Sequence, residues 1–328
     1  MKKRILAILF AFVMVVGVTV ACNGGSGDNA SQDTPTRNPG DPARGAFITQ
    51  AMSNESQAFS WAEFQRLAPD FGFTMQMFAG ENEPAVEVAG IRTAIAEGYD
   101  AIFINPSSIE SIIPALMEAK EAGLVIGMFS SELPEASQHL RDFFCGTDDF
   151  MGGEQAGKFV VQNFPGGANF VEVGGQAGHD AQIKRHDGFR AGIAGSNIVE
   201  LDSQNAPTGW NTHEAMTIME NFITRHGDLI DVVFCHWDNG ASGVIEALQN
   251  QGMHDVFVIG VDGNRTGYAQ VADGTQHLSV GQNFTEMVRK SLENARTMLD
   301  GGSVPAVNHI PLDMVTADNV HQLPVPPW

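Results

Sequence analysis

The chain has 328 residues and a mass of 35.2 kDa, enough for about two domains of the usual ~100–200 residues. Its formal net charge of −21 argues against nucleic acid as a partner, because most of the surface would repel a polyanion. Three cysteines are too few for a disulfide scaffold, and 43% apolar with 17% charged residues is typical of a globular chain.

The N-terminus carries the pattern of an export signal. Three basic residues precede the uncharged stretch 5–21. A permanent membrane span is the alternative, since a stretch of this length is near the short limit for crossing a bilayer. Residues 19–22, TVAC, resemble the bacterial lipobox, where a signal peptidase cleaves before a cysteine that receives lipid. We predict a signal peptide over residues 1–21 and lipidation at Cys22.

The segment after the cysteine has the composition of a linker. Residues 23–45 are rich in Gly, Ser, Asn, Asp and Pro and contain no large apolar side chain. Such a segment cannot bury enough surface to fold. We predict that residues 22–45 form a lipidated, flexible tether. The protein would then be exported and anchored to the membrane through lipid only, in the periplasm or at the outer cell surface.

From residue 46 onward, short apolar runs alternate with longer amphipathic stretches. The runs predict strands at residues 46–51, 74–78, 101–104, 124–129, 143–145, 169–173, 198–201, 232–235, 256–261 and 278–280. Helical spacing of apolar residues predicts helices within residues 85–97, 109–122, 212–223 and 241–249. This alternation implies parallel sheets covered on both faces. We predict an α/β fold with two doubly wound lobes.

The residues that follow each predicted strand are the candidate functional residues, because ligands of such sheets bind at the carboxyl ends of the strands. Most of these residues are neutral hydrogen-bonding groups or carboxylates, with aromatic rings nearby. An amide or a carboxylate can bind adjacent hydroxyl groups, and a ring can pack against the C–H face of a ligand. The pattern therefore favours binding of a neutral, hydroxyl-rich small molecule.

Five motifs in order carry a family resemblance. They are FINP at 103–106, GTDD at 146–149 followed by further glycines, RHDGF at 185–189, WD at 237–238 and GVDG at 260–263. Over residues 46–318 the chain resembles the ribose/galactose type of periplasmic sugar-binding protein. That family shares its fold with the effector domain of lac-repressor-type regulators.

The resemblance implies a periplasmic binding protein type I fold, with two lobes joined by a three-strand hinge and ligand held between them. The N-terminal lobe would comprise residues 46–146 and 283–310. The C-terminal lobe would comprise residues 147–282 and 311–328, with the C-terminal tail packed on it. Hinge closure around ligand is the usual motion of such folds. The protein would act as a monomer that delivers its ligand to a membrane permease of an ABC importer.

The resemblance also implies ligand contacts. Polar sugar contacts of the family fall on Asn105, Arg185, Asp262 and Gln282, and its stacking aromatic falls on Trp210. In the first lobe, the family's asparagine followed by aromatics falls on the segment 53–61. The complete set of ligand contacts that we expect is Asn54, Phe59, Asn105, Phe129, Ser130, Thr147, Arg185, Trp210, Trp237, Asp238, Asp262 and Gln282.

Two departures from the family pattern bear on the ligand. After the fourth strand the family often carries Asp-Arg, whereas this chain has Phe-Ser-Ser at 129–131. In the second lobe, Trp237 replaces an asparagine. Both changes put apolar rings where hydrogen-bonding groups stood, so the ligand should offer fewer hydroxyls or a larger apolar face than ribose. A monosaccharide or related polyol is expected, and a nucleoside or furanone-type signal is the alternative ligand.

Several of these residues have a structural alternative that the sequence leaves open. Asp238 could cap a helix, as aspartate commonly does. Asn105 precedes a proline and could simply turn the chain. Phe129 and Trp237 could belong to the core, and Arg185 could be a solvated charge on a helix.

Catalysis has little support in the sequence, and we expect no enzyme activity, cofactor or bound metal. The histidines and aspartates between residues 179 and 187 lack the spacing of a metal site on a helix. The alternative of a different class is a surface-anchored hydrolase that uses Asp148 or Asp262, but no nucleophile–base pair accompanies them. A sensory binding protein with the same fold is a further alternative. Cys145 and Cys235 should be buried thiols, with a disulfide as the alternative.

Overall fold

A computed structural model describes residues 41–328 of the chain. The predicted signal peptide, the lipidation at Cys22 and most of the predicted tether lie outside these residues. Within them, no helix is long and apolar enough to cross a membrane.

The first strand begins earlier than expected. Strand β1 (Ala43–Thr49) starts three residues before the predicted strand, so the predicted tether extends too far, to residue 45. Ala43 is buried and pairs with Phe73 in the neighbouring strand. The sequence did not predict a strand at residues 43–45 because they include no large apolar side chain. The strand nevertheless requires a glycine at position 45. A Cβ atom at Gly45 would lie 2.5 Å from the sulfur of Met75.

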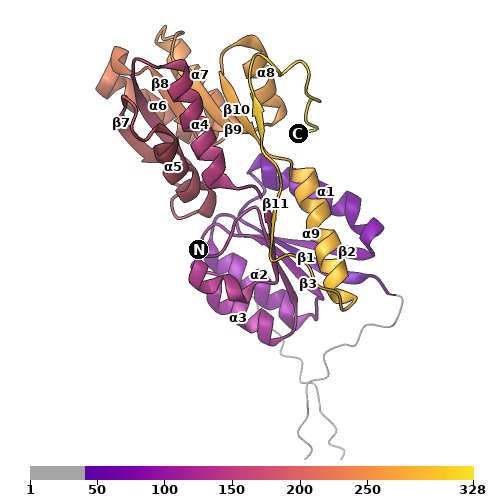
Figure 1. Cartoon of the computed structure of the whole chain (residues 1–328). Helices are drawn as coiled ribbons and strands as arrows, with labels where there is room; N and C mark the ends of the chain where they lie inside the picture. Colours follow the sequence, from indigo (N-terminus) through magenta and orange to yellow (C-terminus); the bar gives the residue numbers. More distant parts are fainter. Residues whose placement is uncertain (1–40) are drawn as a thin grey trace, which may run out of the picture. The chain divides into compact units, whose positions relative to one another are not determined.

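Two six-stranded sheets form the framework (Figure 1). The first has the order β11-β5-β4-β3-β1-β2, with β11 (Val307–His309), β5 (Phe143–Gly146), β4 (Val125–Phe129), β3 (Ala101–Asn105) and β2 (Phe73–Ala79). The second has the order β12-β10-β9-β8-β6-β7, with β12 (Asp313–Val315), β10 (Leu278–Gly281), β9 (Phe257–Asp262), β8 (Val232–Cys235), β6 (Ala168–Gly174) and β7 (Ile198–Asn205). This confirms the predicted α/β class. One pairing, β10 with β12, is antiparallel and was not anticipated.

Helices accompany each sheet, and we call each sheet with its helices a lobe. The first lobe contains α1 (Glu55–Leu67), α2 (Pro84–Ala96), α3 (Ile113–Glu121) and α9 (Phe284–Leu299). The second contains α4 (Asp149–Asn163), α5 (Asp180–Ile193), α6 (Thr212–His226), α7 (Asp238–Asn250) and α8 (Arg265–Asp273). Strands β3 and β4 are buried along their whole length, as expected for strands covered on both faces.

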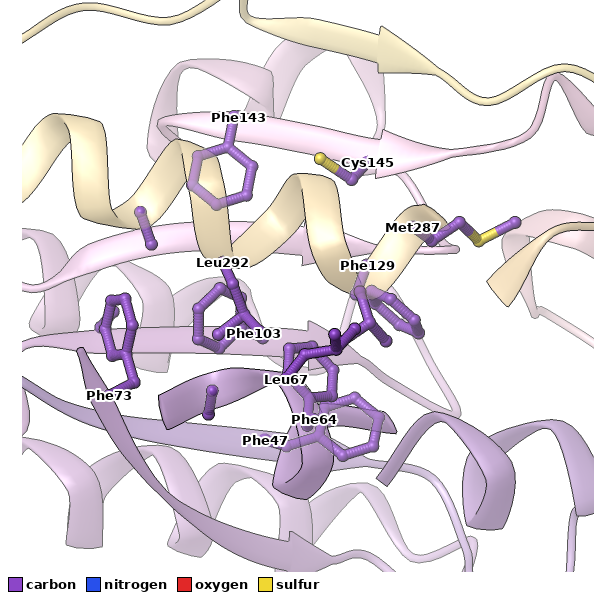
Figure 2. Packing of buried hydrophobic residues seen from close by; sticks show 14 of the residues in the cluster. Phe47, Phe64, Leu67, Phe73, Phe103, Phe129, Phe143, Cys145, Met287 and Leu292 are labelled. Atoms are coloured by element: carbon purple, nitrogen blue, oxygen red, sulfur yellow. The ribbon is translucent and has the colours of Figure 1, made fainter. Parts of the chain in front are cut away.

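The chain passes between the two sheets at residues 147–148, 282–283 and 310–312. The second passage returns the chain to the first lobe, where α9 covers the sheet. Met287 and Leu292 of α9 join a cluster of phenylalanine rings (Figure 2). Phe47 and Phe129 meet edge to face there, with ring centroids 5.6 Å apart. The polar residues of the first two passages, at 147–148 and 282–283, therefore lie between two well-packed cores.

The C-terminal tail extends beyond the second lobe, on which we predicted that it packs. Strand β12 pairs with β10, and Val320 packs with Tyr268 of α8, both in the second lobe. The tail then ends in the first lobe, where Trp328 packs against Phe59 and Phe284. No local pattern in the tail signalled this contact.

Cys145 and Cys235 are buried free thiols, as expected, and not a disulfide. Burial raises the pKa of the Cys145 thiol to about 11. Burial also raises the pKa of the Cys235 thiol well above its ordinary value. Both cysteines are therefore protonated and unreactive at neutral pH.

Candidate ligand-binding site

A narrow cavity of about 30 Å³ lies at the carboxyl ends of strands from both sheets. Most of its lining residues are polar, and two of the others carry indole rings. Its lining residues are Gln50, Asn54, Ser56, Gln57, Asn105, Ser130, His179, Ala181, Arg185, Trp210, Trp237, Asp262, Gln282 and Phe284. We call it the inner cavity.

A second, larger cavity adjoins the first. Its volume is about 550 Å³, and it shares Asn54, Ser56, Trp210, Trp237 and Asp262 with the inner cavity. Its other lining residues are Ser53, Glu55, Asn82, Thr208, Asn211, Thr212, His213 and Asn239. We call this space the outer cavity, and it continues the inner one between the lobes.

The structure brings eight of the twelve predicted ligand contacts to the inner cavity. They come from both lobes and from segments up to 228 positions apart, as the positions of Asn54 and Gln282 show (282 − 54 = 228). The eight are Asn54, Asn105, Ser130, Arg185, Trp210, Trp237, Asp262 and Gln282.

Two aromatic residues that we expected at the ligand lie elsewhere. Phe129 is completely buried and packs against Phe47 and Phe64 in the core of the first lobe. It is the last residue of β4, and its side chain faces the helices, whereas the next residue, Ser130, reaches the cavity. Phe59 stacks on Trp328 instead of lining the cavity.

Thr147 and Asp238 also support the site from outside the cavity lining. Asp238 is completely buried, and its carboxylate accepts hydrogen bonds from the backbone N–H groups of Gly263 and Asn264. The side chains of Ser279 and Gln276 donate to the same carboxylate. Because this carboxylate is completely buried and binds the backbone at 263–264, Asp238 fixes the loop that carries Asp262.

Thr147 also contributes to the site indirectly, through the side chain of Gln282. Its hydroxyl donates to Gln282 Oε1 at 2.9 Å, and Gln282 Nε2 donates to Asp262 Oδ1 at 3.2 Å. These two hydrogen bonds fix the orientation of the Gln282 amide. Asp262 itself has a φ of 126°, a strained backbone conformation for a residue with a side chain. Burial by the surrounding protein raises the pKa of its carboxyl well above the ordinary value.

Two hydrogen bonds hold the Arg185 side chain in the wall of the inner cavity. Its Nε donates to Asp149 Oδ1 at 2.8 Å, and its Nη1 donates to the backbone oxygen of His236 at 2.5 Å. Both side chains of the Arg185–Asp149 pair are at least 95% buried. The charge of Arg185 is therefore balanced within the protein, and the ligand need not be an anion.

A buried carboxylate lies behind Arg185. Glu172 accepts hydrogen bonds from His236 Nε2 at 2.7 Å and from His186 Nδ1 at 2.9 Å. Arg190 and Ser203 donate to it as well. Burial alone would raise the pKa of Glu172, but the histidine hydrogen bonds and the charge of Arg190 bring it well below the usual range. The network fixes His236, whose carbonyl oxygen holds Arg185.

Three aromatic rings form a corner of the inner cavity. Trp210 meets Trp237 edge to face at 5.7 Å, and His179 meets Trp210 edge to face at 5.2 Å. Burial lowers the pKa of His179 to about 3, so its ring is neutral. Its Nδ1 accepts from the N–H of Ala181, which leaves Nε2 as the donor to the Ser131 hydroxyl at 3.2 Å.

A glycine makes room for the Trp237 ring. A Cβ atom on Gly240 would lie 2.4 Å from Cε2 of Trp237. Gly240→Ala should therefore displace the ring, destabilise the fold by ~1–3 kcal/mol and weaken ligand binding roughly tenfold. Isothermal titration calorimetry and tryptophan fluorescence would measure this. Gly166→Ala is the control, because a Cβ there meets nothing within 4 Å. Equal affinities for both variants would contradict the prediction.

Four buried polar atoms in this wall have no protein partner. They are Gln50 Oε1, Asn105 Oδ1, Trp210 Nε1 and Trp237 Nε1. Leaving such groups unpaired costs ~1–3 kcal/mol each. Two acceptors and two donors in one wall match a partner that both donates and accepts hydrogen bonds, and hydroxyl groups do both.

The sequence interpretation missed six lining residues, Gln50, Ser56, Gln57, His179, Ala181 and Phe284. Gln50 directly follows β1, but the predicted strand ran past it to residue 51. His179 precedes α5, a helix that the sequence did not delimit. Phe284 begins α9 immediately after a passage between the lobes. Ending the predicted strand two residues earlier, at Thr49, would have indicated Gln50.

Among residues 41–328, no cluster of His, Cys, Asp and Glu has the arrangement of a metal site. The histidines at 179 and 186 have separate protein partners. His179 bonds to Ser131, and His186 bonds to Glu172.

Comparison with known proteins agrees with this architecture. The chain is 28% identical to the ribose import binding protein RbsB of Escherichia coli K12 over 253 residues, 76% of this chain and 83% of that protein. A galactofuranose binding protein has the same fold, with a TM-score of 0.81 at 23% identity, covering 86% of this chain and 97% of that one.

An ABC transporter solute binding protein from Bacillus halodurans, solved with bound myo-inositol, also has this fold. Its TM-score is 0.81 at 22% identity, over 87% of this chain and 98% of that one. The family of the periplasmic binding protein domain matches residues 45–303, most of the described residues. The chain therefore belongs to the periplasmic binding protein domain family.

Proposed function

We propose that this protein is the solute-binding component of an ABC importer, which binds a monosaccharide or related polyol between its lobes without catalysis. The observation that carries the proposal is the inner cavity, where unpaired donors and acceptors face the same space as Asp262 and Arg185. The relatives and structures named above bind or import ribose, galactofuranose and myo-inositol, all of which are rich in hydroxyl groups.

The hydroxyl groups of a ligand can pair with the unpaired polar atoms of the inner cavity. Asn105 and Gln50 offer amide oxygens to hydroxyl donors, and the indole N–H groups of Trp210 and Trp237 need acceptors. Asp262 can accept from two adjacent hydroxyls. A phosphorylated sugar fits less well, because Arg185 is already neutralised by Asp149. The ligand is therefore a neutral molecule.

The aromatic lining supplies apolar contact. Trp210, Trp237 and Phe284 offer ring surfaces to the C–H face of a sugar. Because Trp237 lines the cavity where the family pattern has an asparagine, this wall favours a ligand with a larger apolar face than ribose. The 550 Å³ outer cavity leaves room for a substituent, which supports a nucleoside as the second candidate ligand.

Direct contacts between the lobes support binding by closure. The N–H of Glu132 in the first lobe donates to Asp180 Oδ2 in the second at 2.9 Å. Glu55 of the first lobe accepts from Asn239 Nδ2 of the second at 2.5 Å. Such contacts form when lobes close around a ligand and break when they separate. Binding and release, with no chemical step, are the whole mechanism.

The cellular setting is part of the proposal. The family is one of periplasmic binding proteins, so the protein works outside the cytoplasm. We propose that residues 1–21 direct export, that Cys22 carries lipid and that the monomer passes its ligand to a membrane permease. Globomycin, which blocks lipoprotein signal peptidase, should cause the uncleaved precursor to accumulate, and Cys22→Ser should abolish labelling of the protein with radioactive palmitate.

A ligand panel tests the binding function. We expect one of D-ribose, D-xylose, D-allose, myo-inositol, xylitol or adenosine to raise the thermal midpoint by several degrees. A ligand at a thousandfold over its Kd adds about 4 kcal/mol to the folded state. Unfolding and refolding beforehand removes any ligand carried over from the expression host. Stabilisation by adenosine alone would overturn the sugar assignment, and no stabilisation after refolding would contradict the proposed ligand class.

A further inference from the structure

The C-terminal tail connects the two lobes a fourth time, without being one of the chain passages between the sheets. We call residues 316–328 the C-terminal strap. Its first half packs on the second lobe, through Val320 against Tyr268. Its end lies on the first lobe, where the Trp328 ring stacks on Phe59 of α1 with centroids 5.5 Å apart and planes 14° apart.

Contacts from both lobes hold Trp328 in place. Its backbone oxygen accepts from the N–H of Arg265 at 2.6 Å, and Arg265 Nη2 donates to the backbone oxygen of Pro327 at 3.3 Å. Arg265 is the first residue of α8, so its N–H has no partner within the helix. From the first lobe, Phe284 meets the indole edge to face at 5.1 Å.

A polar contact between the lobes lies beside the strap. Glu55 is one helical turn before Phe59 on α1, so the two side chains share a face of the helix. Glu55 accepts from Asn264 Nδ2 at 3.3 Å, and Asn264 caps the helix that begins with Arg265. The end of the strap and Glu55 therefore span the same junction between α1 and α8.

Phe284 links this junction to the ligand site. It lines the inner cavity and also a cavity of about 180 Å³ beneath the strap, whose wall includes Trp328. One ring thus separates the ligand space from the strap. Trp328 packs on Phe284 of the first lobe and is held by Arg265 of the second lobe. The position of the Phe284 ring in the wall of the inner cavity therefore depends on how the two lobes contact each other.

We propose that the C-terminal strap is a clamp between the lobes, with Trp328 as a positioning residue that stabilises the closed arrangement and holds Phe284 against the ligand. This rests on the proposed function, since closure around a ligand is the event on which the clamp acts. A contact made only in the closed arrangement raises its population, and the apparent Kd falls by the same factor.

The clamp predicts a kinetic effect. Release requires the lobes to separate, so losing the strap contacts should speed dissociation and leave association unchanged. Trp328→Ala removes two aromatic contacts, and we expect the dissociation rate and the Kd to rise about tenfold. Stopped-flow fluorescence would measure both rates, with the panel compound that stabilises the wild-type chain most as the probe.

Matched variants separate a clamp from a general loss of stability. Trp328→Phe should restore affinity to within about threefold, because a ring still stacks on Phe59. Phe59→Ala should repeat the effect of Trp328→Ala, and the double variant should be no weaker than either alone. Val325→Ala is the control within the strap, because Val325 is 65% exposed and should change nothing.

Two results would overturn the clamp alone. One is an unchanged dissociation rate in Trp328→Ala while the wild-type chain binds its ligand. The other is an equal acceleration in Val325→Ala. Failure of every panel compound to bind the wild-type chain would overturn the proposed function, and the clamp with it.

Discussion

Replacing Arg185 with Met is expected to weaken ligand binding by roughly a hundredfold or more and to destabilise the fold by ~3–5 kcal/mol. The variant loses a guanidinium from the inner cavity and leaves the Asp149 carboxylate buried without its partner. The backbone oxygen of His236 loses its donor as well. Urea unfolding would measure the stability, and titration calorimetry would measure the affinity.

A second substitution separates these two effects. Adding Asp149→Asn to the Arg185→Met variant removes the uncompensated charge, so most of the stability should return. Ligand binding should stay lost, because Arg185 and not Asp149 lines the cavity. If binding returned together with stability, Arg185 would be structural and the ligand would not contact it.

Glu172→Gln is expected to cost ~3–5 kcal/mol of folding free energy, although Glu172 does not line the cavity. Two histidines, Arg190 and Ser203 donate to this buried carboxylate. A glutamine offers one acceptor oxygen in place of two and brings an N–H group among donors. Ligand affinity should fall too, because the network fixes the backbone oxygen that holds Arg185.

Glu200→Gln is the matched control for this prediction. Glu200 pairs with the same Arg190, but its side chain is 36% exposed. Exposed ion pairs contribute little, so we expect less than ~1 kcal/mol of destabilisation. Urea unfolding of both variants would measure the difference. Equal losses of folding free energy in the two variants would mean that the burial of Glu172 does not account for the stability that its hydrogen bonds contribute.

The first ten strands, β1 to β10, were predictable because each is a short apolar run in the sequence, whereas β11, β12 and the helices α1, α4, α5, α8 and α9 were not predicted. The eight lining residues found from sequence were identified in one of two ways. They follow strands or belong to motifs whose place in the fold the family resemblance supplied. Asn105 and Asp262, for example, end β3 and β9. The parallel topology places each at the carboxyl edge of its own sheet, and the family resemblance implied that these two edges face each other.

The errors arose where the partner of a side chain lies far away in the sequence. Asp238 stood at a strand end like the others, but its donors come from residues 263 to 279. Phe59 was assigned to the ligand because no local pattern shows that Trp328, at the other end of the chain, stacks on it. Phe129 and Ser130 are adjacent, but β4 ends at Phe129, and Ser130, with a φ of 62°, lines the cavity.

The two buried thiols have a practical consequence. Because Cys145 and Cys235 are inaccessible and protonated, neither would react with a maleimide dye at neutral pH. In a Cys22→Ser chain, a single cysteine placed on an exposed position beside the outer cavity, such as Thr208, would be labelled selectively. A dye at this position would change its fluorescence as ligand enters, so the native pair of cysteines already suits the protein to use as a reagentless optical sensor.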